Sequence, residues 1–112
     1  TDGSKGYVIT TSKAYRQGNR EKYWFAYRRN PLGDLKKCKE KYVVYGCKDE
    51  NTMICLPVSE IEKSLDRLNL STDEDGMITH WHMVFFKDSA GIVTWMLSRP
   101  EIEEINVNKY VI

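Results

Sequence analysis

Most of this chain consists of short runs of β-forming residues separated by turn residues. The clearest run is residues 78–86, which is rich in aromatic and β-branched side chains. In residues 22–28 the side chains alternate between two faces. One face carries Tyr23, Phe25 and Tyr27, and the other carries Trp24, Ala26 and Arg28. A chain built in this way must bury one face of a sheet, so we expect a sheet to dominate the fold.

Four further runs are predicted to be strands, at residues 7–11, 41–48, 52–56 and 92–97. Asp49, Glu50 and Asn51 predict a hairpin turn, so the strands on either side of them should pair antiparallel. The remaining segments are expected to be a polar connection at residues 12–21, a turn of helix at 34–39 and an edge strand or tail at 107–112.

The spacing of the apolar residues changes after Pro57. Ser59 and Glu62 have the spacing of a capping box, which favours a main helix over residues 60–68. The apolar stripe of that helix would be Ile61, Leu65 and Leu68. A second capping pair, Ser98 and Glu101, predicts a short helix at residues 100–104. The expected fold class is therefore α+β, with a mostly antiparallel sheet of about five to six strands packed on one main helix.

The chain has 112 residues, enough for one hydrophobic core. We expect a flexible tail at residues 1–6 and a single domain at 7–112, excised from a longer protein because the sequence does not begin with Met. No apolar run approaches the roughly 20 residues of a membrane span, so no membrane partner is expected. The three cysteines form no Cys-x-x-Cys pair, which favours a reducing, cytoplasmic location.

Charge is divided between the two parts of the chain. Residues 1–48 hold twelve Lys/Arg against four Asp/Glu, whereas residues 49–112 hold five against twelve. The net charges of +8 and −7 nearly cancel in the total of +1. Eight of the thirteen aromatic residues also lie in the basic part. Cations hold phosphates and rings stack on bases, so this combination favours a nucleic-acid surface, with DNA as the expected ligand.

The candidate interface lies around the strand at residues 22–28. We expect Trp24 or Tyr27 to stack on a base. Phosphate contacts are expected from five cations, Arg28, Arg29, Lys36, Lys37 and Lys39. In this interpretation the protein is a noncatalytic recognition module that needs no cofactor.

The chain's two histidines, His80 and His82, suggest a different chemistry. They stand at positions i and i+2 of a predicted strand and so project from the same face, which is a geometry that suits a divalent metal. The candidates for a third ligand are Asp49, Glu50 and the acidic residues at 73–75. The triplet His80-Trp81-His82 resembles the His-hydrophobic-His element of the HUH single-strand endonucleases. That resemblance implies a metal-dependent phosphodiesterase or nuclease with a tyrosine nucleophile, for which Tyr15 and Tyr110 are the candidates.

Four segments, residues 9–13, 23–25, 42–45 and 54–61, resemble in their succession the later strands and helix of restriction-type and other prokaryotic defence domains. The resemblance covers residues 7–68. The metal-binding Asp and the Glu-x-Lys of an active restriction nuclease are missing, so the resemblance implies a recognition module of a restriction-modification system and not its cutting domain.

Three functions therefore remain open from the sequence. The first is nucleic-acid recognition through the basic and aromatic surface, and the second is metal-dependent phosphodiester chemistry at His80 and His82. The third is a protein-interaction domain that assembles through its opposite charge poles, with copies of itself or with other domains of a larger chain.

Overall fold

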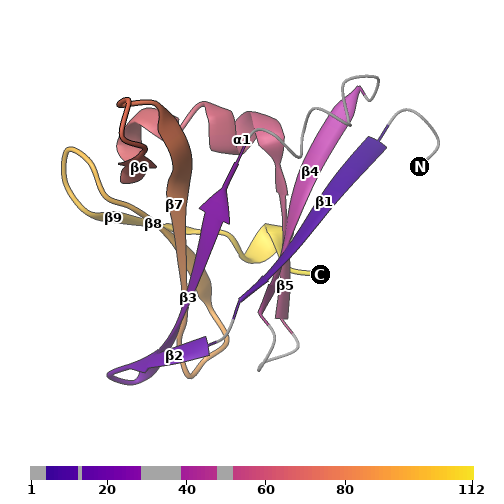
Figure 1. Cartoon of the computed structure of the whole chain (residues 1–112). Coiled ribbons are helices and arrows are strands. Elements are labelled where there is room, and N and C mark those ends of the chain that lie inside the picture. Colours follow the sequence, from indigo (N-terminus) through magenta and orange to yellow (C-terminus); the bar gives the residue numbers. More distant parts are fainter. Residues whose placement is uncertain (1–4, 13, 29–38, 48–51) are drawn as a thin grey trace.

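The computed structural model describes residues 5–12, 14–28, 39–47 and 52–112, and for residues 14–17 the backbone alone. The described residues form a mostly β fold of two sheets with one short α-helix (Figure 1). The predicted dominance of antiparallel strands is confirmed, but the predicted single sheet is wrong, because the strands divide between two sheets that share one core.

The smaller sheet has three strands in the order β1-β4-β5. Its strands are β1 (Lys5–Ser12), β4 (Glu40–Cys47) and β5 (Thr52–Pro57). β4 and β5 pair antiparallel as predicted, whereas β1 and β4 pair parallel. The predicted hairpin turn at residues 49–51 lies outside the described residues, and so does the predicted helical turn at 34–39 except for Lys39. Lys5 and Gly6 belong to β1, so the predicted tail at 1–6 is wrong for these two residues.

The larger sheet is antiparallel, in the order β2-β3-β7-β8-β9, with β6 also paired to β7. Its strands are β2 (Ala14–Gln17), β3 (Arg20–Tyr27), β6 (Leu70–Thr72), β7 (Ile78–Lys87), β8 (Val93–Leu97) and β9 (Glu103–Asn106). The predicted connection at 12–21 instead contains β2 and a tight turn in which Gly18 has a positive φ of 65°. The predicted helix at 100–104 is also wrong, because β9 pairs with β8 there.

The predicted main helix at 60–68 is replaced by a five-residue helix, α1 (Val58–Glu62), and a 3₁₀ turn, η2 (Leu65–Arg67). No side chain caps α1, because the residue at its N-cap is Pro57. The Glu62 carboxylate, which the capping box would require, accepts a hydrogen bond of 2.6 Å from the Tyr27 hydroxyl instead. Within the described residues, no helix is long and apolar enough to cross a membrane.

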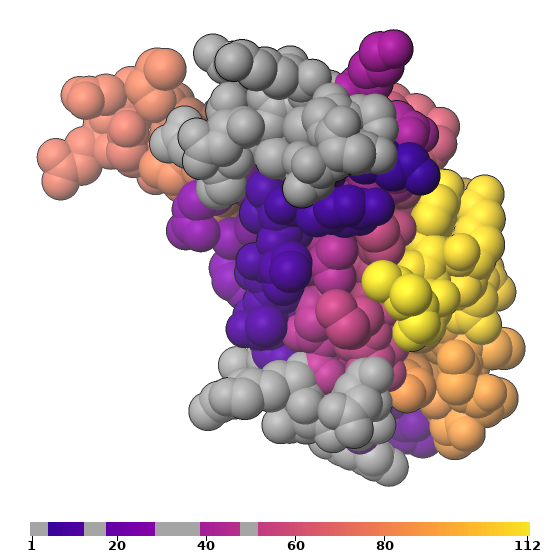
Figure 2. Space-filling view, turned by 90° about the vertical axis from the view of Figure 1, so that its right-hand side faces the viewer, coloured from indigo at the N-terminus to yellow at the C-terminus, as the bar shows by residue number. Residues whose placement is uncertain are grey.

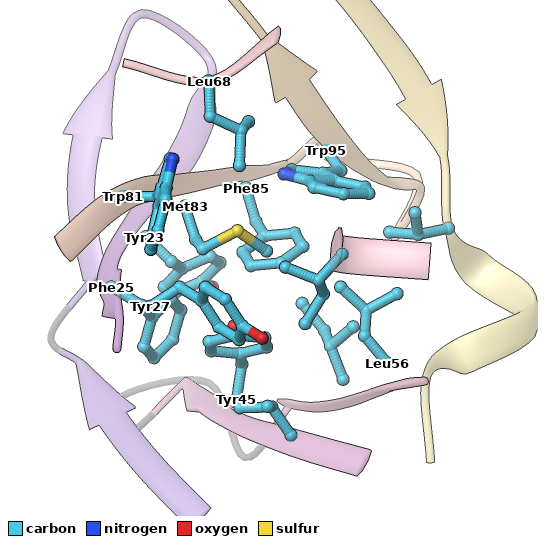
Figure 3. Packing of buried hydrophobic residues seen from close by; sticks show 14 of the residues in the cluster. Tyr23, Phe25, Tyr27, Tyr45, Leu56, Leu68, Trp81, Met83, Phe85 and Trp95 are labelled. Carbon is cyan, nitrogen blue, oxygen red and sulfur yellow. The ribbon is translucent and has the colours of Figure 1, made fainter. Parts of the chain in front are cut away.

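The core lies between the two sheets. The larger sheet contributes Phe25 and Phe85, and the smaller sheet contributes Tyr45. The centroid of the Tyr45 ring is 4.7 Å from that of Phe25 and 5.2 Å from that of Phe85 (Figure 3). The stripe predicted for the helix is buried as well, since Ile61, Leu65 and Leu68 belong to the same cluster. The spacing of these apolar residues therefore correctly predicted that they are buried, although the helix is shorter than predicted.

The opposite side of the smaller sheet faces outwards. Figure 2 shows this side, formed by β1, β4, β5 and the C-terminal residues. Tyr7 of β1 is 47% exposed there, and its ring stacks on that of Tyr42 with the centroids 5.4 Å apart. The larger sheet also has an outer face, and the candidate site lies on that one.

Candidate nucleic-acid interface

Three rings gather on the outer face of the larger sheet. Because Tyr23, Phe25 and Tyr27 of β3 face the core, Trp24 faces outwards, and its side chain is 39% exposed. On the neighbouring strand β7, His80 and His82 face the same way, as their spacing predicted. The centroid of the Trp24 ring lies 5.4 Å from that of His82 and 6.1 Å from that of His80, and the ring planes are nearly perpendicular in both pairs. The two imidazoles stack with centroids 5.3 Å apart. We call Trp24, His80 and His82 the ring cluster.

Hydroxyl groups on β6 and at the start of β7 hold the two imidazoles. The Thr79 hydroxyl donates to the Ser71 carbonyl oxygen at 3.1 Å, so its oxygen accepts from Nδ1 of His80, also at 3.1 Å. Nε2 of neutral His80 is then the nitrogen with the lone pair. Nε2 of His82 lies 2.9 Å from the Ser71 hydroxyl oxygen. These bonds fix the orientation of both rings before any ligand arrives.

The pKa of His80 is lowered from its ordinary value of 6.5. Partial burial is the main cause, and the positive charge of Arg28 and the neighbouring His82 add to it. His80 is therefore mainly neutral at pH 7. An anion placed beside Arg28 would oppose this shift, because it would favour the protonated imidazole.

Arg28 follows directly after β3 and is exposed. It stands at a groove of about 190 Å³ between β1 and β3. The groove is lined by Val8, Ile9, Thr10, Ala26, Arg28 and Val43, together with part of Tyr27. Ala26 also pairs with His82 across the β3–β7 ladder, so the groove and the ring cluster are neighbours. The sequence pattern gave no sign of this groove, because residues 8–10 and 26–28 meet only through the fold.

Two other basic residues, Lys39 and Lys41, line a pocket of about 380 Å³ at the start of β4. The pocket also includes Ser59 and Tyr42, whose hydroxyl donates to Glu40 at 3.1 Å. This hydrogen bond raises the pKa of Tyr42. Lys39 is exposed at this pocket, and its role as a phosphate ligand stays a prediction. The other predicted phosphate ligands, Arg29, Lys36 and Lys37, lie outside the described residues.

The predicted stacking role of Tyr27 does not agree with the structure. Its side chain is only 2% exposed, and its ring lies 6.0 Å from that of Trp81 in the core. Its hydroxyl donates to Glu62. Tyr27 follows the alternation that places Tyr23 and Phe25 on the buried face, so its ring is too deeply buried for a base to stack on it.

Some of the opposite charges of the two parts of the chain are used within the fold. Arg20 of β3 donates to Glu104 of β9 at 2.6 Å, and its guanidinium lies 4.1 Å from the centre of the Phe86 ring. The bond to Arg20 lowers the pKa of Glu104. In the acidic part, Glu103 pairs with Arg67 at 2.6 Å. The Arg20 guanidinium is therefore engaged in contacts within the protein, whereas Arg28 has no carboxylate partner among the described residues.

A metal site at the two histidines lacks a third ligand in the described part of the chain. No group of three or more His, Cys, Asp or Glu side chains converges among those residues. The predicted acidic candidates at 73–75 are in a turn, where the Asp73 carboxylate accepts from the backbone N–H groups of Asp75 and Met77. Asp49 and Glu50 lie outside the described residues.

No protein-family model, curated protein or solved structure matches the chain. A function must therefore be inferred from the geometry of the site itself.

Proposed function

We propose that this protein is a noncatalytic nucleic-acid-binding module whose ligand contacts the ring cluster and Arg28. The observation that carries the proposal is the position of Trp24, an exposed ring on the outer sheet face that lies nearly perpendicular to two oriented imidazoles. A base can stack on such a ring with little loss of side-chain freedom. Such stacking contributes about 1–3 kcal/mol per base.

The electrostatics of the site support an anionic ligand. Arg28 is exposed next to the ring cluster, and Lys22 lies on the same outward face of β3, one alternation from Trp24. Lys39 directly precedes β4, and Lys41 in β4 is the register partner of Gly6 in β1. Phosphates held by these cations would position the chain while the rings contact the bases.

The resemblance of residues 7–68 to restriction-type recognition domains is compatible with this proposal. Metal-dependent phosphodiester chemistry is less well supported, since the described residues place no third ligand beside His80 and His82. Assembly through opposite charge poles is also less well supported, because Arg20 and Glu104 already join the two poles inside one molecule.

The test is a binding titration with a panel of DNA and RNA oligonucleotides, each about 12 nucleotides long, at about 50 and about 200 mM salt. We expect binding that weakens with salt. Trp24→Ala should lower the affinity by about 1–3 kcal/mol, roughly 5- to 150-fold. Arg28→Gln should lower the affinity for every sequence and reduce the salt slope by about one.

Two control variants match these changes. Tyr7→Ala removes a ring of similar exposure from the outer face of the smaller sheet, and Lys109→Gln removes one exposed positive charge near the C-terminus. Both should bind like the unchanged protein. Equal losses for Trp24→Ala and Tyr7→Ala, or no binding to any oligonucleotide, would contradict the proposal.

A further inference from the structure

The groove between β1 and β3 has features that a general nucleic-acid surface does not require. Its volume of about 190 Å³ is below the range of about 300–1,000 Å³ that is typical of pockets for drug-sized ligands. Its lining residues are mainly apolar, and the polar ones are Thr10 on β1 and, on the other side, Tyr27 and Arg28. A space of this size and lining suits one flat heteroaromatic ring that is joined to an anionic group.

The groove and the ring cluster are separated by the width of one strand. Ala26 lines the groove and is the register partner of His82, whose ring is 5.4 Å from that of Trp24. Arg28 lies two residues further along the chain, directly after β3, and acts on His80 electrostatically. The groove therefore offers a place for one base and the Trp24 ring a place for its neighbour in the same strand. Arg28 lies where it can contact the phosphate between them.

We propose that the groove binds one unpaired base of a single-stranded nucleic acid, while a neighbouring base stacks on Trp24. This inference rests on the proposed function and names its substrate class. In a duplex, both faces of a base are stacked and its pairing edge is occupied, so a base enters a groove only after it has been extruded, at a cost of a few kcal/mol. Unpaired bases are splayed apart readily, and the site should therefore prefer single strands.

The experiment compares one labelled oligonucleotide of about 12 nucleotides, single-stranded and as its blunt duplex, by fluorescence anisotropy. The unchanged protein should bind the single strand at least about tenfold more tightly than the duplex, which corresponds to about 1.4 kcal/mol. Equal or tighter binding of the duplex would overturn the inference.

Variants that fill the groove provide the second arm. Thr10→Leu fills it from β1 and Ala26→Leu fills it from β3, so a folding defect in one leaves the other informative. Each should weaken single-strand binding about tenfold or more and leave duplex binding unchanged. Thr11→Leu is the matched control, because Thr11 is exposed, does not line the groove and receives the same substitution. Thermal melting of each variant confirms that it is folded.

The outcomes separate the two proposals. If Trp24→Ala and Arg28→Gln weaken binding but the groove-filling variants bind single strands normally, the groove inference fails and the proposed function stands. If the unchanged protein binds neither form of the oligonucleotide, both fail.

Discussion

At the scale of single residues, the side-chain alternation in β3 and β7 determines the site. The outward position of Trp24 and the shared face of His80 and His82 could be predicted from a period of two, since a strand leaves no other arrangement. The same alternation argues against Tyr27 as a stacking residue, and the structure buries it. The hydroxyl groups of Ser71 and Thr79 could not be predicted as ring partners, because the pairing of β6 with β7 is not visible in either segment alone.

His80 gives a prediction for pH. Its folded pKa lies below 6.5, so the unfolded chain binds more protons than the folded one between these two values. The contribution of neutral His80 to the free energy of unfolding is therefore complete above pH 6.5, and it decreases as the pH falls through the folded pKa of His80. Urea unfolding of the unchanged protein and of His80→Gln should show a smaller loss of stability at acid pH in the variant. An identical pH profile for both would contradict the assignment.

Ligand binding should depend on pH in the opposite sense. A bound phosphate near Arg28 favours protonated His80, so oligonucleotide affinity should rise as the pH is lowered from about 7.5 to about 5.5. The rise should be smaller in His80→Gln. Titrations at constant ionic strength measure it, and an affinity that is independent of pH would show that the imidazole does not contact the ligand.

At the scale of elements, most strands could be predicted but their partners could not. The strands at 41–48 and 52–56 are adjacent in sequence, and their pairing followed from a short connection. β1 and β4 are separated by the β2–β3 hairpin, so their parallel pairing depends on distant contacts. The predicted helix after Pro57 is longer than the observed one, because the Glu62 carboxylate bonds to Tyr27 on another element and does not cap the helix.

The Tyr27–Glu62 bond links β3 to α1 and predicts a stability effect without a binding effect. Tyr27→Phe keeps the buried ring and removes the 2.6 Å hydrogen bond to a carboxylate. The free energy of unfolding should fall by about 1.5–3 kcal/mol, which is typical of a bond to a charged group. Denaturant unfolding measures this change. Oligonucleotide affinity should not change, because Phe keeps the ring and the hydroxyl that it removes is bonded to Glu62. A loss of affinity in a folded variant would show that this hydroxyl contributes to binding.

At the scale of the whole molecule, one core joins the two sheets. Phe85 is fully buried and its ring lies near those of Phe25, Tyr45 and Trp95, which come from both sheets. The division into two sheets could not be predicted, because each strand shows only which of its faces is buried and not which strand lies opposite. The segregation of charge could be seen in the sequence, but only the structure shows that Arg20 and Glu104 partly cancel it.

The shared core predicts that the protein unfolds as one unit. Phe85→Ala should reduce the free energy of unfolding by about 3–5 kcal/mol. The loss of strand signal in circular dichroism should coincide with the change in tryptophan fluorescence. Two separate transitions in the unchanged protein would show that the sheets are independent.

The account depends on where a nucleic acid touches the molecule, and an NMR titration of ¹⁵N-labelled protein with a single-stranded oligonucleotide measures this most directly. The predicted result is a set of shifts at the Trp24 indole N–H and at the backbone amides of Ala26, Arg28, His80 and His82, with Tyr7 and Met53 on the opposite sheet unchanged. Shifts confined to Tyr7 and Met53, or no shifts at all, would contradict the account.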